Sequence, residues 1–299
     1  MPFVIEAKNL EKAYGAKRAL NGFNLNVEKG IIFGLLGPNG AGKTTAIEIM
    51  LGLRKSDNGN ISVLGENPEK HFGKISPRIG AMLQEGGINP GLKPIEAIKL
   101  YRSFYPDGLD ANELIRDVDL EGITTPVRRL SGGQAQSLSL ALAIVGKPDL
   151  VFLDEPTVGM DPRARRRTWD IIKKLKDSGT TVILTTHLMD EAEQLCDEIA
   201  IVSKGRVIAQ GDTQTLTSSS QNNIEVEFSD EVNGDKVADF ILENVSQKTS
   251  RSIVISSESN PQLFLKLAQY SNENNLTVTK YSADERKLED VFIELTDES

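Results

Sequence analysis

A glycine-rich stretch near the start of the chain has the residue types needed to bind phosphate. Gly37 and Gly42 lie five residues apart, and Lys43 and Thr44 follow directly, which is the pattern of a phosphate-binding loop. The backbone N–H groups of residues 40–44 would face an anion from a helix N-terminus, where free amides and the helix dipole favour negative charge. The predicted nucleotide-binding residues are Gly37, Pro38, Asn39, Gly40, Ala41, Gly42, Lys43, Thr44 and Thr45.

Three further polar side chains stand where apolar runs end. Asp154 closes the run 150–153, Glu155 follows at once, and His187 lies just beyond the run 181–185. Open α/β sheets bind ligands at the carboxyl edge of their strands, so Asp154 is expected beside the glycine loop. A carboxylate pair can also begin an ordinary helix, and a lone histidine more often has a structural role. These residues therefore depend on companion motifs for their interpretation.

The string Leu-Ser-Gly-Gly-Gln at residues 130–134 is such a companion motif. Ser131 precedes a helical stretch, so this segment also presents a helix N-terminus to an anion. Together with the glycine loop and the later carboxylates, the string resembles the ATP-binding cassette family. The resemblance covers roughly residues 4–213, along which the motifs occur in the family's order and spacing.

The resemblance implies roles around one nucleotide, with ATP as substrate and Mg²⁺ as its metal ion. Lys43 would pair with the β- and γ-phosphates, while Thr44 and Asp154 would hold Mg²⁺. Glu155 would polarise the attacking water, and His187 would contact the γ-phosphate. A general base is worth about 10²–10⁴ in rate, so the presence of Glu155 favours a true hydrolase.

Other residues of the resemblance lie farther along the site. Gln84 would sense Mg²⁺ and water, which makes it both a metal and a catalytic candidate, and Tyr14 would stack on adenine. Asp161 matches a loop at the dimer seam. The signature residues would contact ATP bound to a second copy, so that each chain supplies half of two sites; they are Ser131, Gly132, Gly133 and Gln134.

Two stretches do not follow from this resemblance. The family usually continues the signature with a basic residue, Gln and Arg, whereas here Ala135, Gln136 and Ser137 follow. Residues 163–167 include four arginines, which would suit DNA binding. Their position on the first turns of a helix favours a solvated or interface surface instead.

Composition limits the classes of partner. Residues 1–220 hold equal numbers of acidic and basic side chains, so the whole formal net charge of −9 lies after residue 220. Nucleic-acid modules usually carry a basic surface that replaces counterions, so no nucleic-acid partner is expected. The start of the chain does not resemble a signal peptide, and the single cysteine, Cys196, fits a reducing compartment.

The apolar pattern predicts an α/β fold around the glycine loop. The run 31–36 reads as a strand buried on both faces, and the loop and a helix follow it. Helix 163–177 lies between strands 150–153 and 181–185, and this β-α-β order implies a parallel sheet. The remaining expected elements are antiparallel N-terminal strands 3–10 and 22–28, helix 43–53, helices 94–104, 112–119 and 132–145 in an inserted helical subdomain over 85–145, and a hairpin of 199–202 with 206–209.

The C-terminal part has an organisation of its own. We expect a phosphate-loop ATP-binding cassette domain over 1–214, a linker over 215–223 that is rich in Ser, Thr, Gln and Asn, and a small α/β accessory domain over 224–299. Its predicted strands are 224–228, 252–256 and 276–281, and its predicted helices are 235–243, 261–271 and 287–295. The ending 282–295 resembles the tail of ABC-2 type exporter ATPases for drugs, antibiotics or lipids.

The sequence therefore predicts the ATP-binding and ATP-hydrolysing subunit of an exporter. The resemblance implies a second ATPase subunit, in a homodimer, and a separately encoded transmembrane permease, which would place the chain at the cytoplasmic side of the cell membrane. The alternatives are an importer ATPase and a soluble cassette ATPase acting on ribosomes or chromosomes. The chain has one ATPase half and no sustained heptads between residues 44 and 131, which disfavours the soluble alternative.

Overall fold

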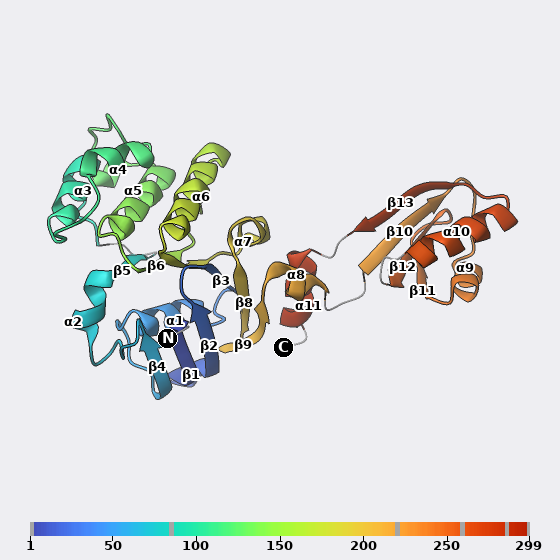
Figure 1. Ribbon diagram of the computed structural model, residues 1–299, viewed down its shortest axis with the longest axis horizontal. Coiled ribbons are helices and arrows are strands. Elements are labelled where there is room, and N and C mark those ends of the chain that lie inside the picture. Colours follow the sequence, from blue (N-terminus) through green and yellow to red (C-terminus); the bar gives the residue numbers. More distant parts are fainter. Residues whose placement is uncertain (1–2, 84–86, 219–221, 258–260, 285–286, 298–299) are drawn as a thin grey trace. The chain divides into compact units, whose positions relative to one another are not determined.

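The computed structural model describes residues 3–83, 87–218, 222–257, 261–284 and 287–297 (Figure 1). The chain divides into two compact units, one formed by Met1–Thr213 with Leu295–Ser299 and the other by Gln214–Glu294. No helix among the described residues combines the length and apolar character that crossing a membrane requires.

A six-stranded sheet forms the centre of the first unit. Its order is β5-β6-β7-β3-β8-β9, and all neighbours are parallel except the last pair, which is antiparallel. The three middle strands are buried along their whole length, as their unbroken apolar runs predict. The strands are β3 (Ile32–Leu36), β5 (Ile79–Met82), β6 (Leu150–Asp154), β7 (Thr181–Thr185), β8 (Glu198–Ser203) and β9 (Arg206–Gly211). The predicted α/β class with a mainly parallel core sheet is confirmed.

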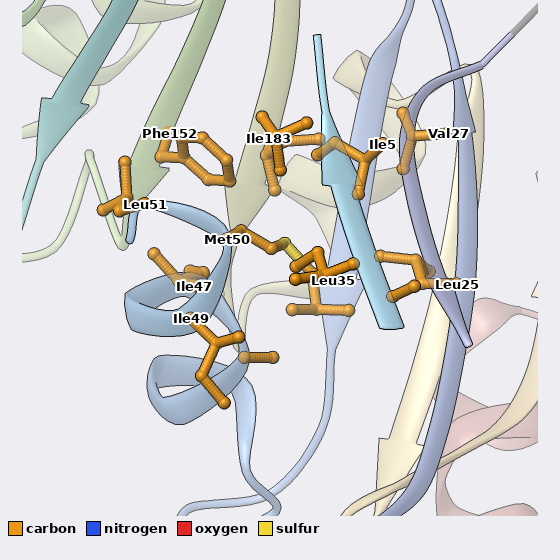
Figure 2. Close-up of a cluster of buried hydrophobic side chains, with 14 of the residues drawn as sticks. Ile5, Leu25, Val27, Leu35, Ile47, Ile49, Met50, Leu51, Phe152 and Ile183 are labelled. Carbon is orange, nitrogen blue, oxygen red and sulfur yellow. The ribbon is translucent and has the colours of Figure 1, made fainter. Parts of the chain in front are cut away.

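An antiparallel sheet of order β2-β1-β4 packs beside it, with helix α1 between the two (Figure 2). Ile47 and Met50 of the helix share one buried cluster with Phe152 and Ile183 of the central sheet and Ile5 of the antiparallel sheet. This cluster packs α1 against both sheets, and the helix begins where the loop after β3 ends. The elements are β1 (Phe3–Tyr14), β2 (Lys17–Glu28), β4 (Asn58–Val63) and α1 (Lys43–Met50).

A second buried cluster holds the helical part of the first unit. Helix α5 lies so close to β5 that a Cβ added at Gly80 would stand 2.0 Å from the carbonyl oxygen of Ala143, so this crossing requires glycine. The helices are α2 (Phe72–Ile75), α3 (Pro94–Arg102), α4 (Ala111–Asp117), α5 (Gly132–Ile144), α6 (Pro162–Asp177) and α7 (Met189–Leu195), with 3₁₀ turns η1 (Ser76–Arg78) and η2 (Val127–Arg129).

The second unit folds around a four-stranded antiparallel sheet of order β11-β12-β10-β13. Its β-α-β-β-α-β order is that of ferredoxin-like folds, and α9 and α10 share one buried cluster with β10 and β12. The expected three-stranded sheet was wrong by one strand, because β11 is short and largely polar. The elements are β10 (Asn222–Phe228), α9 (Gly234–Ile241), β11 (Asn244–Gln247), β12 (Ser252–Ser257), α10 (Pro261–Glu273) and β13 (Val278–Asp284).

Two helices flank this sheet in the chain. Helix α8 (Thr213–Ser218) begins two residues before the stretch 215–223 that the sequence suggested as a linker and overlaps its first part, and α11 (Leu288–Asp297) follows β13. The last residues of α11 group with the first unit. The second unit therefore lies in sequence between two parts of the first.

Candidate functional site

The glycine loop connects the end of β3 to the start of α1, and Lys43 is the first residue of that helix. Its side chain is buried, and Nζ donates hydrogen bonds to the carbonyl oxygens of Gly37, at 2.6 Å, and Pro38, at 3.2 Å. Burial lowers the pKa of Lys43, while the nearby carboxylates of Glu155 and Asp154 oppose that shift. The loop thus holds a desolvated cation against its own backbone.

The loop conformation depends on glycine. Gly40 and Gly42 have φ angles of 80° and 108°, which side-chain-bearing residues rarely adopt. A Cβ at Gly42 would also stand 2.4 Å from the carbonyl oxygen of Ala19. These glycines bring the backbone to the N-terminus of α1, so the loop fits a phosphate group and its lysine supplies the matching charge.

Asp154 and Glu155 lie where β6 ends, and Thr185 at the end of β7 ties them together. The Thr185 hydroxyl donates to the Asp154 carboxylate, and the backbone N–H of Glu155 donates to the Thr185 hydroxyl oxygen at 3.0 Å and to its carbonyl oxygen at 3.1 Å. Asp154 is buried, and this burial raises the pKa of its carboxyl. Sequence reasoning missed Thr185, although a threonine that closes an apolar strand beside a carboxylate is the available signal.

Glu155 and His187 approach each other at this edge. The His187 Nδ1 lies 3.3 Å from Glu155 Oε1, and the side chains are 54% and 17% exposed. Glu155 has a φ of 50°, and such strained backbone conformations concentrate at functional sites. The structure therefore brings together Lys43, Asp154, Glu155 and His187, which the sequence had connected only through motif order.

The donors available for Mg²⁺ are oxygen atoms, which this ion prefers. Thr44 is exposed at the second position of α1, and Asp154 is the last residue of β6, which β7 separates from the strand β3 that leads into the loop. Gln84, the third expected metal residue, lies outside the described residues. The chemistry of Thr44 and Asp154 fits a magnesium ion that is shared with bound phosphates.

The signature segment caps α5. The Ser131 Oγ accepts from the Gln134 backbone N–H at 3.2 Å, and the Gln134 Oε1 accepts from the Ser131 N–H at 3.0 Å. This reciprocal capping box fixes the exposed helix start. Ser131, Gly133 and Gln134 line a cavity of 220 Å³ together with Asp161 and Ser137. The signature residues and Asp161 thus gather in one place, separate from the lysine and the carboxylates in sequence.

Asp161 caps α6. Its Oδ1 accepts from the N–H groups of Arg163 and Ala164, both at 2.9 Å, and these hydrogen bonds lower the pKa of the carboxyl. Farther along the arginine run, Arg167 forms an ion pair with Asp119. This arginine therefore belongs to an interaction within the first unit.

Tyr14 ends β1 with its side chain 41% exposed. Two cations lie near its ring, Arg54 with Cζ 5.2 Å and Lys12 with Nζ 5.9 Å from the centroid. Glu48 of α1 holds Arg54 through hydrogen bonds of 2.6 and 3.3 Å. The tyrosine is thereby connected to the helix that follows the glycine loop, a contact that sequence spacing did not predict.

The buried strand, the glycine loop, the helix and the carboxylates at the sheet edge together define a phosphate-loop nucleoside triphosphatase. The family described as ABC transporter matches residues 20–158. The daunorubicin/doxorubicin resistance ATP-binding protein DrrA of Streptomyces peucetius is 35% identical over 98% of this chain and 92% of its own length. The Nod factor export ATP-binding protein I of Ralstonia nicotianae is 31% identical over 98% of this chain and 94% of its own. The chain belongs to the ABC transporter family, as an ATP-binding ATPase subunit.

Solved structures agree with that assignment. The ATP-binding subunit of an ABC transporter superimposes with a TM-score of 0.66 at 27% identity, over 72% of this chain and 92% of that one. An ATP-binding cassette solved as a dimer in a post-hydrolysis state with ADP and Pi gives a TM-score of 0.64 at 26% identity, over 70% of this chain and 98% of that one.

Proposed function

We propose that this chain hydrolyses ATP to drive export, as one of two ATPase subunits that act on a separately encoded membrane permease. The observation that supports export is that the similarity to exporter subunits extends over nearly the whole chain. Two relatives named for drug resistance and Nod factor export align over 98% of this chain, and so include the second unit as well as the ATPase unit.

ATP would enter a loop whose shape is already set. Phosphate oxygens would replace the Gly37 and Pro38 carbonyls as partners of the Lys43 ammonium, so a buried cation exchanges neutral acceptors for charged ones. Tyr14, half exposed at the end of β1, would stack on adenine. These roles rest on the burial of Lys43 and the exposure of the tyrosine.

Hydrolysis would use Glu155 as the general base. Its backbone is held by Thr185, and its carboxylate lies beside the His187 ring, so it can take a proton from a water that attacks the γ-phosphate. His187 would donate a hydrogen bond to that phosphate and keep the base oriented. A magnesium ion held by Thr44 and Asp154, with Gln84 as a third residue, would neutralise phosphate charge when bound.

The dimer would be arranged head to tail. Ser131, Gly132, Gly133 and Gln134 at the exposed start of α5 would face the γ-phosphate on the second copy, where free helix amides favour an anion. Asp161 would lie at the seam, because it lines the same cavity as the signature. We further propose that the second unit is an accessory domain and that the dimer docks on its permease at the cytoplasmic side of the membrane.

The test of the hydrolytic role is Glu155→Gln, which keeps the shape of the side chain and removes the base. Turnover should fall by about 10²-fold or more while ATP affinity stays within about twofold, because only the transition state loses an interaction. Glu113→Gln, at an exposed position of α4, is the matched control and should keep wild-type turnover. Near wild-type turnover in Glu155→Gln would overturn the assignment.

Export itself is tested in inverted membrane vesicles that contain the chain and its permease. ATP added outside such vesicles should drive substrate inward, since the cytoplasmic face now points outward. ATP-driven uptake that occurs only in right-side-out vesicles would indicate an importer.

A further inference from the structure

A buried carboxylate on α7 has no role in the site described so far. Glu191 lies four residues after His187 and is only 1% exposed. Its Oε1 accepts hydrogen bonds from the Thr157 hydroxyl at 2.8 Å and from the Trp169 indole N–H at 2.9 Å. Its Oε2 is buried and has no hydrogen-bond partner among the described residues.

The three members of this cluster come from three segments, each of which carries a candidate site residue. Thr157 follows Glu155 by two residues, and Trp169 belongs to α6, which Asp161 caps. Glu191 belongs to α7, which begins two residues after His187. One carboxylate therefore connects the segment of the general base, the helix at the dimer seam and the segment of the histidine.

Short-range hydrogen bonds hold the turn that contains both Glu155 and Thr157. The Val158 N–H donates to the Glu155 carbonyl at 3.3 Å, and the Met160 N–H donates to the Thr157 carbonyl at 3.1 Å. Thr157 itself is fully buried, so its hydroxyl cannot turn to water. Because Thr157 and Glu155 belong to the same turn, we expect a displacement at Thr157 to shift the backbone of Glu155.

Stability alone gives no reason for a carboxylate here. Burying a carboxylate with an unpaired oxygen costs free energy, and apolar replacement of buried ionic groups is often neutral or stabilising. A carboxylate oxygen does offer one rigid acceptor for two donors that approach from different segments. The benefit of Glu191 lies in geometry.

We propose that Glu191 is a positioning residue for ATP hydrolysis, which fixes Glu155 relative to His187 through Thr157 and Trp169. This inference rests on the proposed function. The contact between base and histidine is a single approach of 3.3 Å between partly exposed side chains. The distance between these two side chains therefore depends on the buried residues that hold the two segments in place. Glu191 is hydrogen-bonded to the segment of Glu155 through Thr157 and lies in the helix that follows His187.

The test removes each hydrogen bond with a near-isosteric change. Thr157→Val and Trp169→Phe each delete one donor, and each should lower kcat about tenfold while KM for ATP stays within about twofold, as expected when only transition-state geometry is lost. Glu191→Gln keeps an oxygen that can accept both bonds and should retain most turnover. Glu191→Leu keeps neither bond and should lose at least as much turnover as either single-donor variant.

Thr180→Val is the matched control, because Thr180 is also a buried threonine whose hydroxyl donates, here to the Pro148 carbonyl at 2.9 Å. It should leave kcat within about twofold of wild type, since the lost hydrogen bond costs stability and not geometry at the site. If Thr180→Val lowers kcat as much as Thr157→Val, loss of a buried hydroxyl is the cause and the inference is overturned.

A spectroscopic readout separates positioning from folding. Trp169 is the only tryptophan of the chain, so its emission reports on the cluster alone. In Glu155→Gln protein, ATP binding should change this emission, and adding Thr157→Val should reduce the change. An unaltered ATP response in that double variant overturns the inference.

The two proposals fail differently. Wild-type turnover in Glu155→Gln would overturn the hydrolytic role itself. An inactive Glu155→Gln protein together with wild-type kcat in Thr157→Val and Trp169→Phe would overturn only the role of Glu191.

Discussion

Alanine at Gly42 is expected to destabilise the first unit more than alanine at Gly40, although both glycines belong to one loop. Gly42 has a φ of 108°, and a Cβ there would lie 2.4 Å from the Ala19 carbonyl oxygen and 3.0 Å from Leu20 Cδ2. Gly40 has a φ of 80°, and its nearest atom would be Lys17 Nζ at 3.7 Å, an ordinary contact with a flexible side chain.

The magnitudes follow from these two environments. Alanine in the left-handed region costs about 1–2 kcal/mol, which is the whole expected loss for Gly40→Ala. Gly42→Ala adds a clash with fixed backbone, and overpacking costs typically about 1–3 kcal/mol more. We therefore expect Gly42→Ala to lower the free energy of unfolding by about 2–5 kcal/mol in total, of which the left-handed backbone contributes about 1–2 kcal/mol.

The assay is urea unfolding without nucleotide, followed by Trp169 fluorescence. Because this tryptophan lies in the first unit, its signal reports on the unit that holds the loop, even if the second unit unfolds separately. Equal losses in the two variants would refute the reasoning, since the clash with Ala19 would then contribute nothing.

Two further predictions concern the shared site and the buried carboxylate. Ser131→Arg should abolish hydrolysis without weakening ATP binding to the monomer. Mixing this variant with Lys43→Ala protein should restore partial activity, because the mixed dimer keeps one intact composite site. No recovery in proven mixed dimers would count against a site shared between two chains. Burial raises the pKa of Asp154, so its contribution to stability is present below the ordinary value of 3.8 and is lost as pH rises through the folded value. Asp154→Asn should therefore raise the urea midpoint at pH 7 more than at pH 4, and a lower midpoint at pH 7 would contradict this sign.

The central sheet could be predicted because its strands are apolar over their whole length. Residues 31–36, 150–153 and 181–185 carry that signal, and the helix between the last two implies the parallel order that β6 and β7 show. The fold class follows from these runs and from the glycine loop, so no long-range information is needed to obtain it.

The elements that sequence reasoning missed owe their structure to neighbours. Strand β4 contains Asn-Gly-Asn and exists because β1 pairs with it, and β11 is four largely polar residues paired with β12. The hydrogen bonds of Thr185 to two consecutive residues, and the left-handed backbone of Glu155, likewise depend on how β6 and β7 lie side by side. No periodicity in the chain encodes such contacts.

The second unit enters and leaves its sheet on adjacent strands, because β10 and β13 pair antiparallel with Asn223 opposite Asp284. The pairing of these two strands therefore holds the start and the end of the sheet next to each other. In the first unit, which groups residues 295–299 with residues 1–213, a folded insert of this kind acts as a short loop between the two parts. An unstructured insert of the same length would be about three doublings longer than a ten-residue loop. Closing it would cost about 2 kcal/mol more free energy than closing the ten-residue loop. A folded second unit thus lowers the entropy cost of bringing the two parts of the first unit together.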